Sequence, residues 1–244
     1  MPQNRFYCPE TLSLGTTVKL PASASIHAVR VLRMEEGDTA TLFNGDGFDY
    51  ACELISVKKN AVTAKVKSSI EIKNESPLNI TLLQGISSGD RMDYTIQKAV
   101  ELGVKCIQPI ATERSVVKLN QERAQKRVTH WQNIVNAACE QSGRAVIPSV
   151  DMPVTLSNWL ANHPQDKACR ILLNPIGAKR FAEINKPTDE IQLLIGAEGG
   201  LSTSEIEAAS TNGFQSIILG PRILRTETAA LTAIASIQSL WGDF

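Results

Sequence analysis

The sequence predicts an α/β fold in which a small, mostly antiparallel β domain precedes a larger domain built on a parallel sheet. Two observations carry this prediction. Apolar runs flank the turn residues 44–47, and from Asn79 onward short apolar runs alternate with helical segments. The character of the chain changes near residues 73–77, inside the segment "IKNESPLN". We therefore predict one domain over residues 1–72 and a second over residues 73–244.

The first domain is predicted to consist mainly of strands. The Asn-Gly and Asp-Gly steps of residues 44–47 are strong hairpin signals, so a strand is expected on each side of them. Residues 61–69 alternate apolar and polar side chains with the period of a half-buried strand. One short helix is expected over residues 24–34. Together these elements predict a small β-barrel.

The second domain is predicted to alternate strands with helices, which implies parallel pairing. Gly103 is expected at the C′ position of a helix over residues 91–102. Ser202 and Glu205 are spaced as a capping box at the start of another helix. The apolar runs taken as strands, each leading to a helical stretch, are "ITLLQGI", "VKCIQPI", "CRILLNP", "IQLLIG" and "FQSIILG".

Composition excludes several classes of protein. The chain has 244 residues, of which 43% are hydrophobic and 20% charged. It has no apolar run of about 18 residues and no apolar core of a signal peptide near its start, so we expect a soluble cytoplasmic protein without a membrane partner. The five cysteines are scattered and the three histidines isolated, which argues against a metal site. A net charge of zero argues mildly against RNA binding.

Ligands of open α/β sheets gather beyond the carboxyl ends of the strands. Three loops with Gly or Pro follow predicted strands there, within residues 172–181, 193–205 and 217–230. None contains a phosphate-binding fingerprint, and Glu198 would repel a phosphate. The residues therefore favour a ligand without phosphates, and S-adenosylmethionine, which carries a sulfonium and an ammonium, fits. Glycine-rich turns that merely close the fold are the alternative.

Two of these loops resemble a known pair of motifs. "IGAEGGLSTSEIE" and "LGPRILRTETAAL" look like the paired C-terminal motifs of the SPOUT, or trefoil-knot, methyltransferases. The segments "QKAVELGV", "ERSVVK", "EQSGR", "HAVRVLRMEEGD" and "FNGDGFDY" extend the resemblance to the ribosomal small-subunit RNA uridine N3-methyltransferase family, over nearly the whole chain. One departure is Ala197, which stands where the family's loop leads us to expect Pro.

The resemblance implies a PUA-like N-terminal barrel and a C-terminal α/β domain whose chain end threads through a loop. It also implies that S-adenosylmethionine lies between three loops, residues 173–177, 195–200 and 219–226. On this sequence the implied cofactor-binding residues are Leu173, Pro175, Ile195, Gly196, Glu198, Gly199, Gly200, Leu219, Gly220, Ile223, Leu224, Arg225 and Thr226.

The implied reaction is methyl transfer to N3 of a uridine in 16S ribosomal RNA of the small subunit. Arg225 or Arg144 is expected to stabilise negative charge that develops on the uracil oxygens. The eligible general bases are Glu198, Glu140 and Glu227, with water or hydroxide as the alternative. Glu198 has a second interpretation as the cap of the helix that follows it, and we favour the cap.

The resemblance further implies contacts to RNA phosphates and a homodimer with composite sites. The candidate RNA-binding residues are Arg5, Arg30, Arg33, Arg114 and Lys118. Two other hypotheses stay open: a SPOUT methyltransferase that acts on a different RNA, and a non-catalytic RNA-binding module for ribosome assembly. A third hypothesis is a metabolic enzyme that binds a nucleotide phosphate. The sequence, however, contains neither the mononucleotide nor the dinucleotide phosphate-binding motif.

Overall fold

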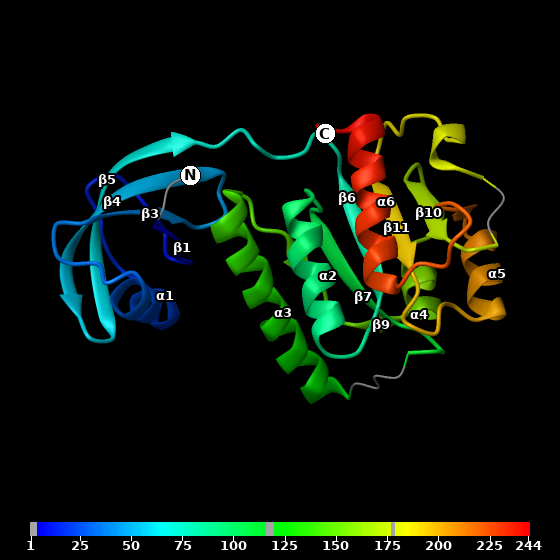
Figure 1. The fold of residues 1–244 in the computed structure, drawn as a ribbon, viewed down its shortest axis with the longest axis horizontal. Helices are drawn as coiled ribbons and strands as arrows, with labels where there is room; N and C mark the ends of the chain where they lie inside the picture. Colours follow the sequence, from blue (N-terminus) through cyan, green and yellow to red (C-terminus); the bar gives the residue numbers. More distant parts are fainter. Residues whose placement is uncertain (1–3, 116–119, 177–178) are drawn as a thin grey trace. The chain divides into compact units, whose positions relative to one another are not determined.

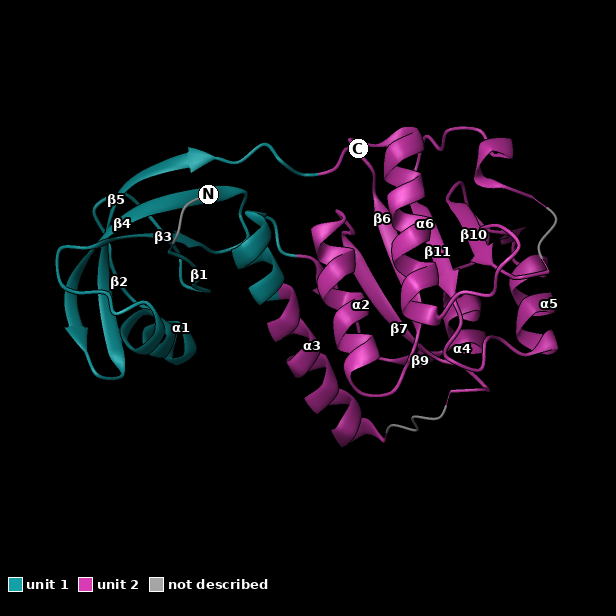
Figure 2. Ribbon diagram, viewed as in Figure 1, with its two compact units in different colours: residues 1–75, 136–147 teal, residues 76–135, 148–244 magenta. Residues whose placement is uncertain are grey.

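The computed structural model describes residues 4–115, 120–176 and 179–244, and the chain forms two compact units (Figure 2). The first unit comprises Met1–Glu75 and Asn136–Ile147, and the second comprises Ser76–Val135 and Pro148–Phe244. One long helix contributes its first part to the second unit and its end to the first. The division into domains at residues 72 and 73 stays a prediction, but it did not anticipate that residues 136–147 pack with the first unit.

The first unit is built on one sheet, within the described residues, whose strand order is β1-β3-β4-β5-β2. The predicted hairpin is confirmed, because β3 and β4 are antiparallel neighbours on either side of residues 44–47. The predicted helix is present but shorter than expected, since a π-helical turn ends at Val31. The elements are β1 (Arg5–Tyr7), β2 (Thr17–Lys19), α1 (Ala22–Ile26), the π-helical turn His27–Val31, β3 (Thr39–Phe43), β4 (Phe48–Lys58) and β5 (Ala61–Glu71).

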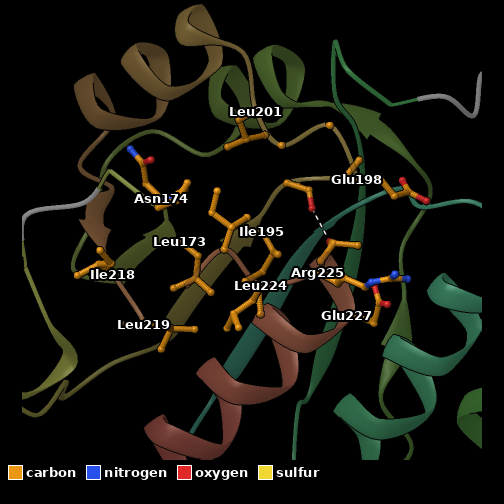
Figure 3. Close-up of a pocket in the computed structure, with 18 of the residues that line it drawn as sticks. Leu173, Asn174, Ile195, Glu198, Leu201, Ile218, Leu219, Leu224, Arg225 and Glu227 are labelled. Carbon is orange, nitrogen blue, oxygen red and sulfur yellow. Dashed lines mark hydrogen bonds between the residues drawn. The ribbon is translucent and has the colours of Figure 1, made fainter. Parts of the chain in front are cut away.

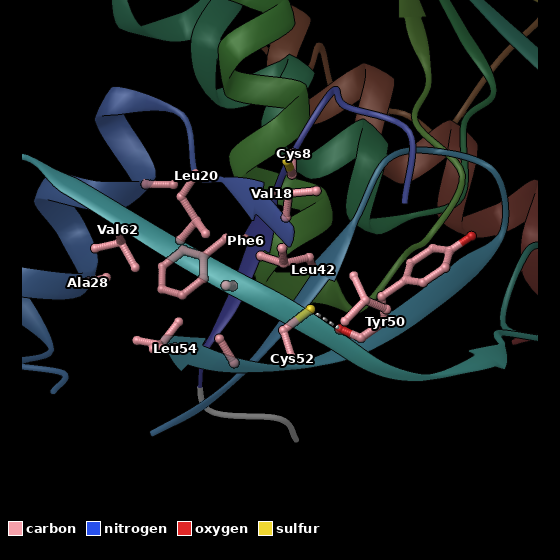
Figure 4. Close-up of a cluster of buried hydrophobic side chains, with 14 of the residues drawn as sticks. Phe6, Cys8, Val18, Leu20, Ala28, Leu42, Tyr50, Cys52, Leu54 and Val62 are labelled. Atoms are coloured by element: carbon pink, nitrogen blue, oxygen red, sulfur yellow. Dashed lines mark hydrogen bonds between the residues drawn. The ribbon is translucent and has the colours of Figure 1, made fainter. Parts of the chain in front are cut away.

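The core of the first unit follows the alternation of its strands (Figure 4). On β5, the side chains of Val62, Ala64 and Val66 are buried, as the period-two pattern predicts. They pack with Phe6 from β1 and Leu42 from β3, among others, in a single apolar cluster. The strands therefore bury one face of the sheet and expose the other.

Arg5 is the buried ionic centre of the first unit. Its side chain is 2% exposed and donates hydrogen bonds to both carboxylate oxygens of Asp49, the shortest at 2.7 Å. It also donates to the backbone carbonyl oxygens of Cys139 and Arg144. These contacts attach residues 136–147 to the sheet. Because these hydrogen bonds occupy the buried guanidinium of Arg5, we do not carry the prediction that Arg5 contacts RNA further.

The second unit is an open sheet of parallel strands with helices packed on it (Figure 1). In the part of the chain described, the strand order is β12-β10-β11-β6-β7-β8, and β9 also pairs with β7. Every pairing is parallel, which confirms the predicted α/β class. The elements are β6 (Ile80–Gly85), α2 (Asp90–Glu101), β7 (Cys106–Ala111), α3 (Gln121–Ser142), β8 (Ser149–Val150), β9 (Val154–Thr155), α4 (Leu156–Asn162), β10 (Cys169–Leu173), the 3-10 turn Phe181–Glu183, β11 (Ile191–Ile195), α5 (Thr203–Thr211), β12 (Gln215–Ile217) and α6 (Thr226–Trp241).

Local signals placed the helix ends correctly. Gly103 has φ of 87° directly after the C-cap of α2, as predicted. Ser202 and Glu205 form the predicted capping box of α5. The helix expected after β10 is wrong: among the described residues between β10 and β11, a single 3-10 turn forms, because Pro187 disfavours helical backbone in the residue before it and limits any longer helix.

Helices α2 and α6 pack side by side against the sheet, whereas α4 and α5 pack together with Leu83, Leu172 and Leu194 (Figure 1). Within the described residues, no helix is both long enough and apolar enough to cross a membrane. Because all the strands are parallel, their carboxyl ends lie along one edge of the sheet, and the loops that follow them meet there.

Replacing Arg5 by Met is expected to lower the free energy of unfolding by about 3–5 kcal/mol, because it leaves the carboxylate of Asp49 buried without its partner. Urea unfolding of both proteins measures this difference. Lys67→Met is the matched control, since its ion pair with Glu53 is about half exposed and such pairs contribute about 0–1 kcal/mol. Equal losses in the two variants would contradict a central role for Arg5.

Candidate functional site

A cavity of about 470 Å³ opens at the carboxyl edge of the second unit, between the segments that follow β10, β11 and β12. We call it the carboxyl-edge pocket. Its volume lies in the range of small-molecule sites. The structure brings together in its lining every residue that the sequence assigned to cofactor binding, namely Leu173, Pro175, Ile195, Gly196, Glu198, Gly199, Gly200, Leu219, Gly220, Ile223, Leu224, Arg225 and Thr226.

The pocket has an apolar side and a charged side (Figure 3). Leu173, Ile218 and Leu219 lie together on one side, at the ends of β10 and β12. Glu198 and Arg225 lie on the other. The glycine-rich loop after β11 lines the pocket and carries Glu198. The arrangement suits a ligand with an apolar ring at one end and charged groups at the other.

The glycine-rich loop lies directly against the end of β6, with no room for side chains. A Cβ added to Gly85 would stand 2.2 Å from the backbone nitrogen of Ala197, and one added to Gly196 would stand 2.7 Å from the backbone carbon of Gly200. The hydroxyl of Thr226 donates to the carbonyl oxygen of Gly196 over 2.6 Å. These contacts fix the position of the glycine-rich loop, which lines the pocket. Sequence reasoning named Gly196 but missed Gly85, whose only signal is its place at a strand end.

Glu198 does not cap the helix that follows it, which corrects the interpretation favoured from the sequence. Its Oε1 accepts hydrogen bonds from the backbone nitrogen and the hydroxyl of Ser88, both at 2.8 Å, and from Nη1 of Arg91 at 3.1 Å. The cap of α5 is Ser202 instead. The reason is spatial: parallel β6 and β11 are neighbours, so the loop after β6 lies beside Glu198.

The same contacts determine the charge of Glu198. Partial burial alone would raise the pKa of its carboxyl, but the hydrogen bonds from Ser88 and Arg91 outweigh it and lower the pKa below the ordinary value of 4.5. Glu198 is therefore ionised at neutral pH. A carboxylate with a lowered pKa and three donors is a weak proton acceptor.

A second carboxylate attaches the start of α5 to the loop after β7. Glu205 accepts from the backbone nitrogen of Ser202 with one oxygen and from the backbone nitrogen of Glu113 with the other, both at 2.9 Å. Beside it, Nη1 of Arg114 donates to the carbonyl oxygen of Gly199 over 3.3 Å. The loops after β6 and β7 are thus both attached to the segment 196–205.

The charged side of the pocket contains residues that sequence reasoning assigned elsewhere or missed. Arg91 and Arg222 line it and were not predicted as site residues, and Arg114 was predicted for RNA rather than for this pocket. Glu227 lines it as well, and its Oε2 is buried with no hydrogen-bond partner among the described residues. Arg91 could have been found from the sequence, because it follows a predicted strand at the carboxyl edge.

Several predicted residues are not among those that line the pocket. Arg144 belongs to the first unit, where it is buried and its guanidinium pairs with both carboxylate oxygens of Glu75. Glu140 is also in the first unit; burial raises its pKa, and it accepts from the backbone nitrogen of Tyr7. We therefore leave Arg144 and Glu140 out of the mechanism proposed below.

The remaining RNA candidates differ in position. Arg30 and Arg33 are exposed in the first unit, and Arg30 donates a hydrogen bond to the side chain of Asn60 over 3.3 Å. Lys118 lies outside the described residues. In the described ranges, no three His, Cys, Asp or Glu side chains are grouped so that they could hold a metal ion.

Residues 74–238 match the family model of the RNA methyltransferase domain, and residues 21–67 match that of the RNA methyltransferase PUA domain. The chain belongs to the RNA methyltransferase family that these models define. Within it, the chain is 36% identical to ribosomal RNA small subunit methyltransferase E of Bacillus subtilis over 87% of this chain and 86% of that protein. The protein of the same name from Buchnera aphidicola (Acyrthosiphon pisum strain) is 33% identical over 98% and 94%.

Two solved structures have the same fold. The small subunit methyltransferase E of Neisseria gonorrhoeae, bound to S-adenosylmethionine, is 45% identical with a TM-score of 0.91 over 100% of this chain and 99% of that one. A methyltransferase of Legionella pneumophila in complex with the same cofactor is 41% identical with a TM-score of 0.94 over 98% of each chain. The predicted class, a parallel α/β domain preceded by a PUA-like domain, is confirmed. The threading of the chain end stays a prediction.

Replacing Gly85 by Ala is expected to destabilise the second unit and to weaken binding of S-adenosylmethionine, the predicted cofactor. The added methyl group would overlap the backbone of Ala197, and such overpacking costs about 1–3 kcal/mol. Thermal unfolding and calorimetric titration with the cofactor measure the two effects. Wild-type stability together with wild-type affinity would show that β6 does not fix the loop.

Glu198 is expected to contribute stability that depends on pH. Its pKa in the folded chain lies below the unfolded value, so the contribution is present above about pH 4.5 and is lost as pH falls through the folded-state pKa. The free energies of unfolding of wild type and Glu198→Gln are measured from about pH 3 to about pH 7, the range over which a carboxyl group titrates, and are compared at each pH. Wild type should be the more stable at pH 7, and the difference should vanish in acid. A constant difference would mean that the charge of Glu198 is irrelevant.

Proposed function

We propose that this protein transfers the methyl group of S-adenosylmethionine to N3 of a uridine in 16S ribosomal RNA. The coarser activity follows from its family: the chain is an S-adenosylmethionine-dependent 16S ribosomal RNA methyltransferase. The choice of N3 as the methylated atom rests on the resemblance of the cofactor loops, and of the segments outside them, to the uridine N3-methyltransferase family. The single observation that carries the proposal is the carboxyl-edge pocket, in which three loops from separate strands join an apolar side to a charged one.

The residues of the carboxyl-edge pocket fit this cofactor. Leu173, Leu219 and Leu224 offer apolar surface for an adenine ring, and the glycines of the loop after β11 let backbone groups approach closely. Glu198 and Glu227 place negative charge on the opposite side, where a sulfonium and an ammonium would be favoured over a phosphate. When bound, the cofactor supplies an electrophilic methyl group.

The chain's own residues must then orient the base and manage one proton. N3 of uridine carries a proton and is a poor nucleophile until the proton leaves. Arg225 lines the charged side of the pocket, immediately before α6. We propose that its guanidinium stabilises the negative charge that spreads onto the uracil oxygens as the proton leaves. With cofactor and base bound, the pocket would orient the reacting atoms and limit the access of water.

Among the carboxylates that line the pocket, Glu227 is our proposed proton acceptor. Glu198 is held by three donors to one oxygen and has a lowered pKa, which suits a positioning role. Glu227 lies beside Arg225 (Figure 3), and its Oε2 accepts no hydrogen bond from the described residues. An oxygen without a donor keeps its lone pairs for a proton.

We also propose that the protein acts as a homodimer and contacts RNA through exposed arginines. Tyr94 on α2 and Leu240 on α6 are each 49% exposed, on two helices that pack side by side. Exposed apolar side chains of this kind favour association. Arg30 and Arg33 supply exposed positive charge on the PUA-like unit. Light scattering of the purified protein tests the dimer, and a monomer at micromolar concentration would contradict it.

The specificity of the reaction is tested by incubating the protein with labelled S-adenosylmethionine and small subunits from cells that lack the gene. The expected result is one labelled nucleoside, N3-methyluridine, in digested 16S RNA. Transfer RNA from the same cells is the control and should stay unlabelled. Label in another nucleoside or in transfer RNA would overturn the proposed specificity, and cofactor binding without transfer would indicate a non-catalytic RNA-binding protein.

Replacing Glu227 by Gln keeps the shape of the side chain and removes its basicity. We expect kcat to fall by about 10²–10⁴-fold, the contribution of general acid–base catalysis, while cofactor affinity stays within a few-fold of wild type. The loss should shrink as pH rises, because the imide then ionises without help. A variant with the wild-type kcat and pH profile would leave water or hydroxide as the proton acceptor.

A further inference from the structure

Two arginines, one from the start of α2 and one from the loop after β7, line the carboxyl-edge pocket, and both are attached to its glycine-rich loop. Arg91, in the first turn of α2, donates through Nη1 to Glu198 over 3.1 Å. Arg114, in the loop after β7, donates through Nη1 to the carbonyl oxygen of Gly199 over 3.3 Å. Strands β6 and β7 are parallel neighbours, so the two loops leave the same stretch of the sheet edge. The two side chains therefore line one rim of the same pocket.

Stability alone does not explain Arg91. Its side chain is 43% exposed, and exposed ion pairs contribute little to folding. Glu198 already accepts two shorter hydrogen bonds from Ser88 on the same oxygen. Holding a long, charged side chain over the pocket costs conformational entropy, which a ligand contact would offset. Arg114 is exposed as well.

The charge around the pocket favours an anion at this rim. The charged residues that line it are four arginines and two glutamates, a formal net charge of +2. They are Arg91, Arg114, Arg222, Arg225, Glu198 and Glu227. Since one glutamate is ion-paired to Arg91, the excess of positive charge comes chiefly from the other arginines. A polyanion that approaches the pocket meets this excess first.

We propose that Arg91 and Arg114 bind phosphates of the RNA strand that flank the target nucleotide, and that Glu198 positions Arg91 for this contact. The inference rests on the proposed function. A guanidinium presents several N–H donors in a rigid fork that matches phosphate oxygens. The contact with Glu198 uses Nη1 and fixes the orientation of the fork. Phosphate contacts of this kind set the register of the strand, so that one base enters the pocket.

The anion at the rim has one other possible source, the carboxylate of the cofactor itself. The two sources are distinguished by measuring RNA and cofactor separately. The variants are Arg91→Gln and Arg114→Gln, each of which removes one positive charge. Lys105→Gln is the matched control: Lys105 is an exposed cation of the same unit, but it directly precedes β7, at the opposite edge of the sheet.

The experiment measures affinity for small-subunit RNA at several salt concentrations and affinity for S-adenosylmethionine by calorimetry, after circular dichroism has established folding. We expect each arginine variant to weaken RNA binding about tenfold and to reduce the salt slope by about 0.7–0.9, the value of one lost phosphate contact. Arg91→Lys, which keeps the positive charge, should have most of the wild-type salt dependence of RNA binding. Cofactor affinity should fall by much less than RNA affinity, and Lys105→Gln should match wild type.

A slope equal to that of wild type in Arg91→Gln, or a loss of cofactor affinity as large as the loss of RNA affinity, would overturn the inference. The positioning role of Glu198 is tested by combining Glu198→Gln with Arg91→Gln. The two effects on RNA affinity should be less than additive, because Glu198 acts through Arg91; full additivity would refute that role. If wild type methylates no small subunits, the proposed function itself fails, which is a distinct result.

Discussion

The structure of the second unit depends on the direct contact between the end of β6 and the loop after β11. Gly85 and Gly196 have no space for a Cβ, so backbone meets backbone there. The hydroxyl of Thr226 then links the two, since it donates to Gly196 and accepts from the side chain of Gln84 over 2.9 Å. The loop that lines the pocket is therefore held by backbone contacts and by the hydroxyl of Thr226.

The charged side shows how the same fold can hold a cationic cofactor and an anionic substrate. Negative charge near the glycine-rich loop comes from Glu198 and Glu227, and positive charge at the rim comes from Arg91 and Arg114. Because Glu198 is paired with Arg91, neither charge is left isolated before the ligands arrive. In the proposed function, a chain with a net charge of zero can bind RNA because the positive charge at the pocket is local.

What the sequence could predict follows from the range of the interactions involved. The hairpin at residues 44–47 and the capping box of Ser202 and Glu205 depend on neighbours in the chain, and both were predicted correctly. The family motifs predicted the lining of the pocket. The partners of Glu198 and Arg5 lie 110 and 44 residues away, and no local pattern reveals such pairs. For the same reason, the sequence did not anticipate that residues 136–147 pack with the first unit.

The hydrogen bond between Thr226 and Gly196 joins two segments of the pocket that are synthesised one after the other. During synthesis, β6, β10 and β11 emerge well before the segment 217–229 that completes the lining. Until that segment is made, the side chain of Gln84 lacks its contact with the hydroxyl of Thr226, and the pocket lacks one of its sides. Cofactor binding by the complete pocket therefore requires that residues 217–229 have been synthesised and have folded beside the loop after β11.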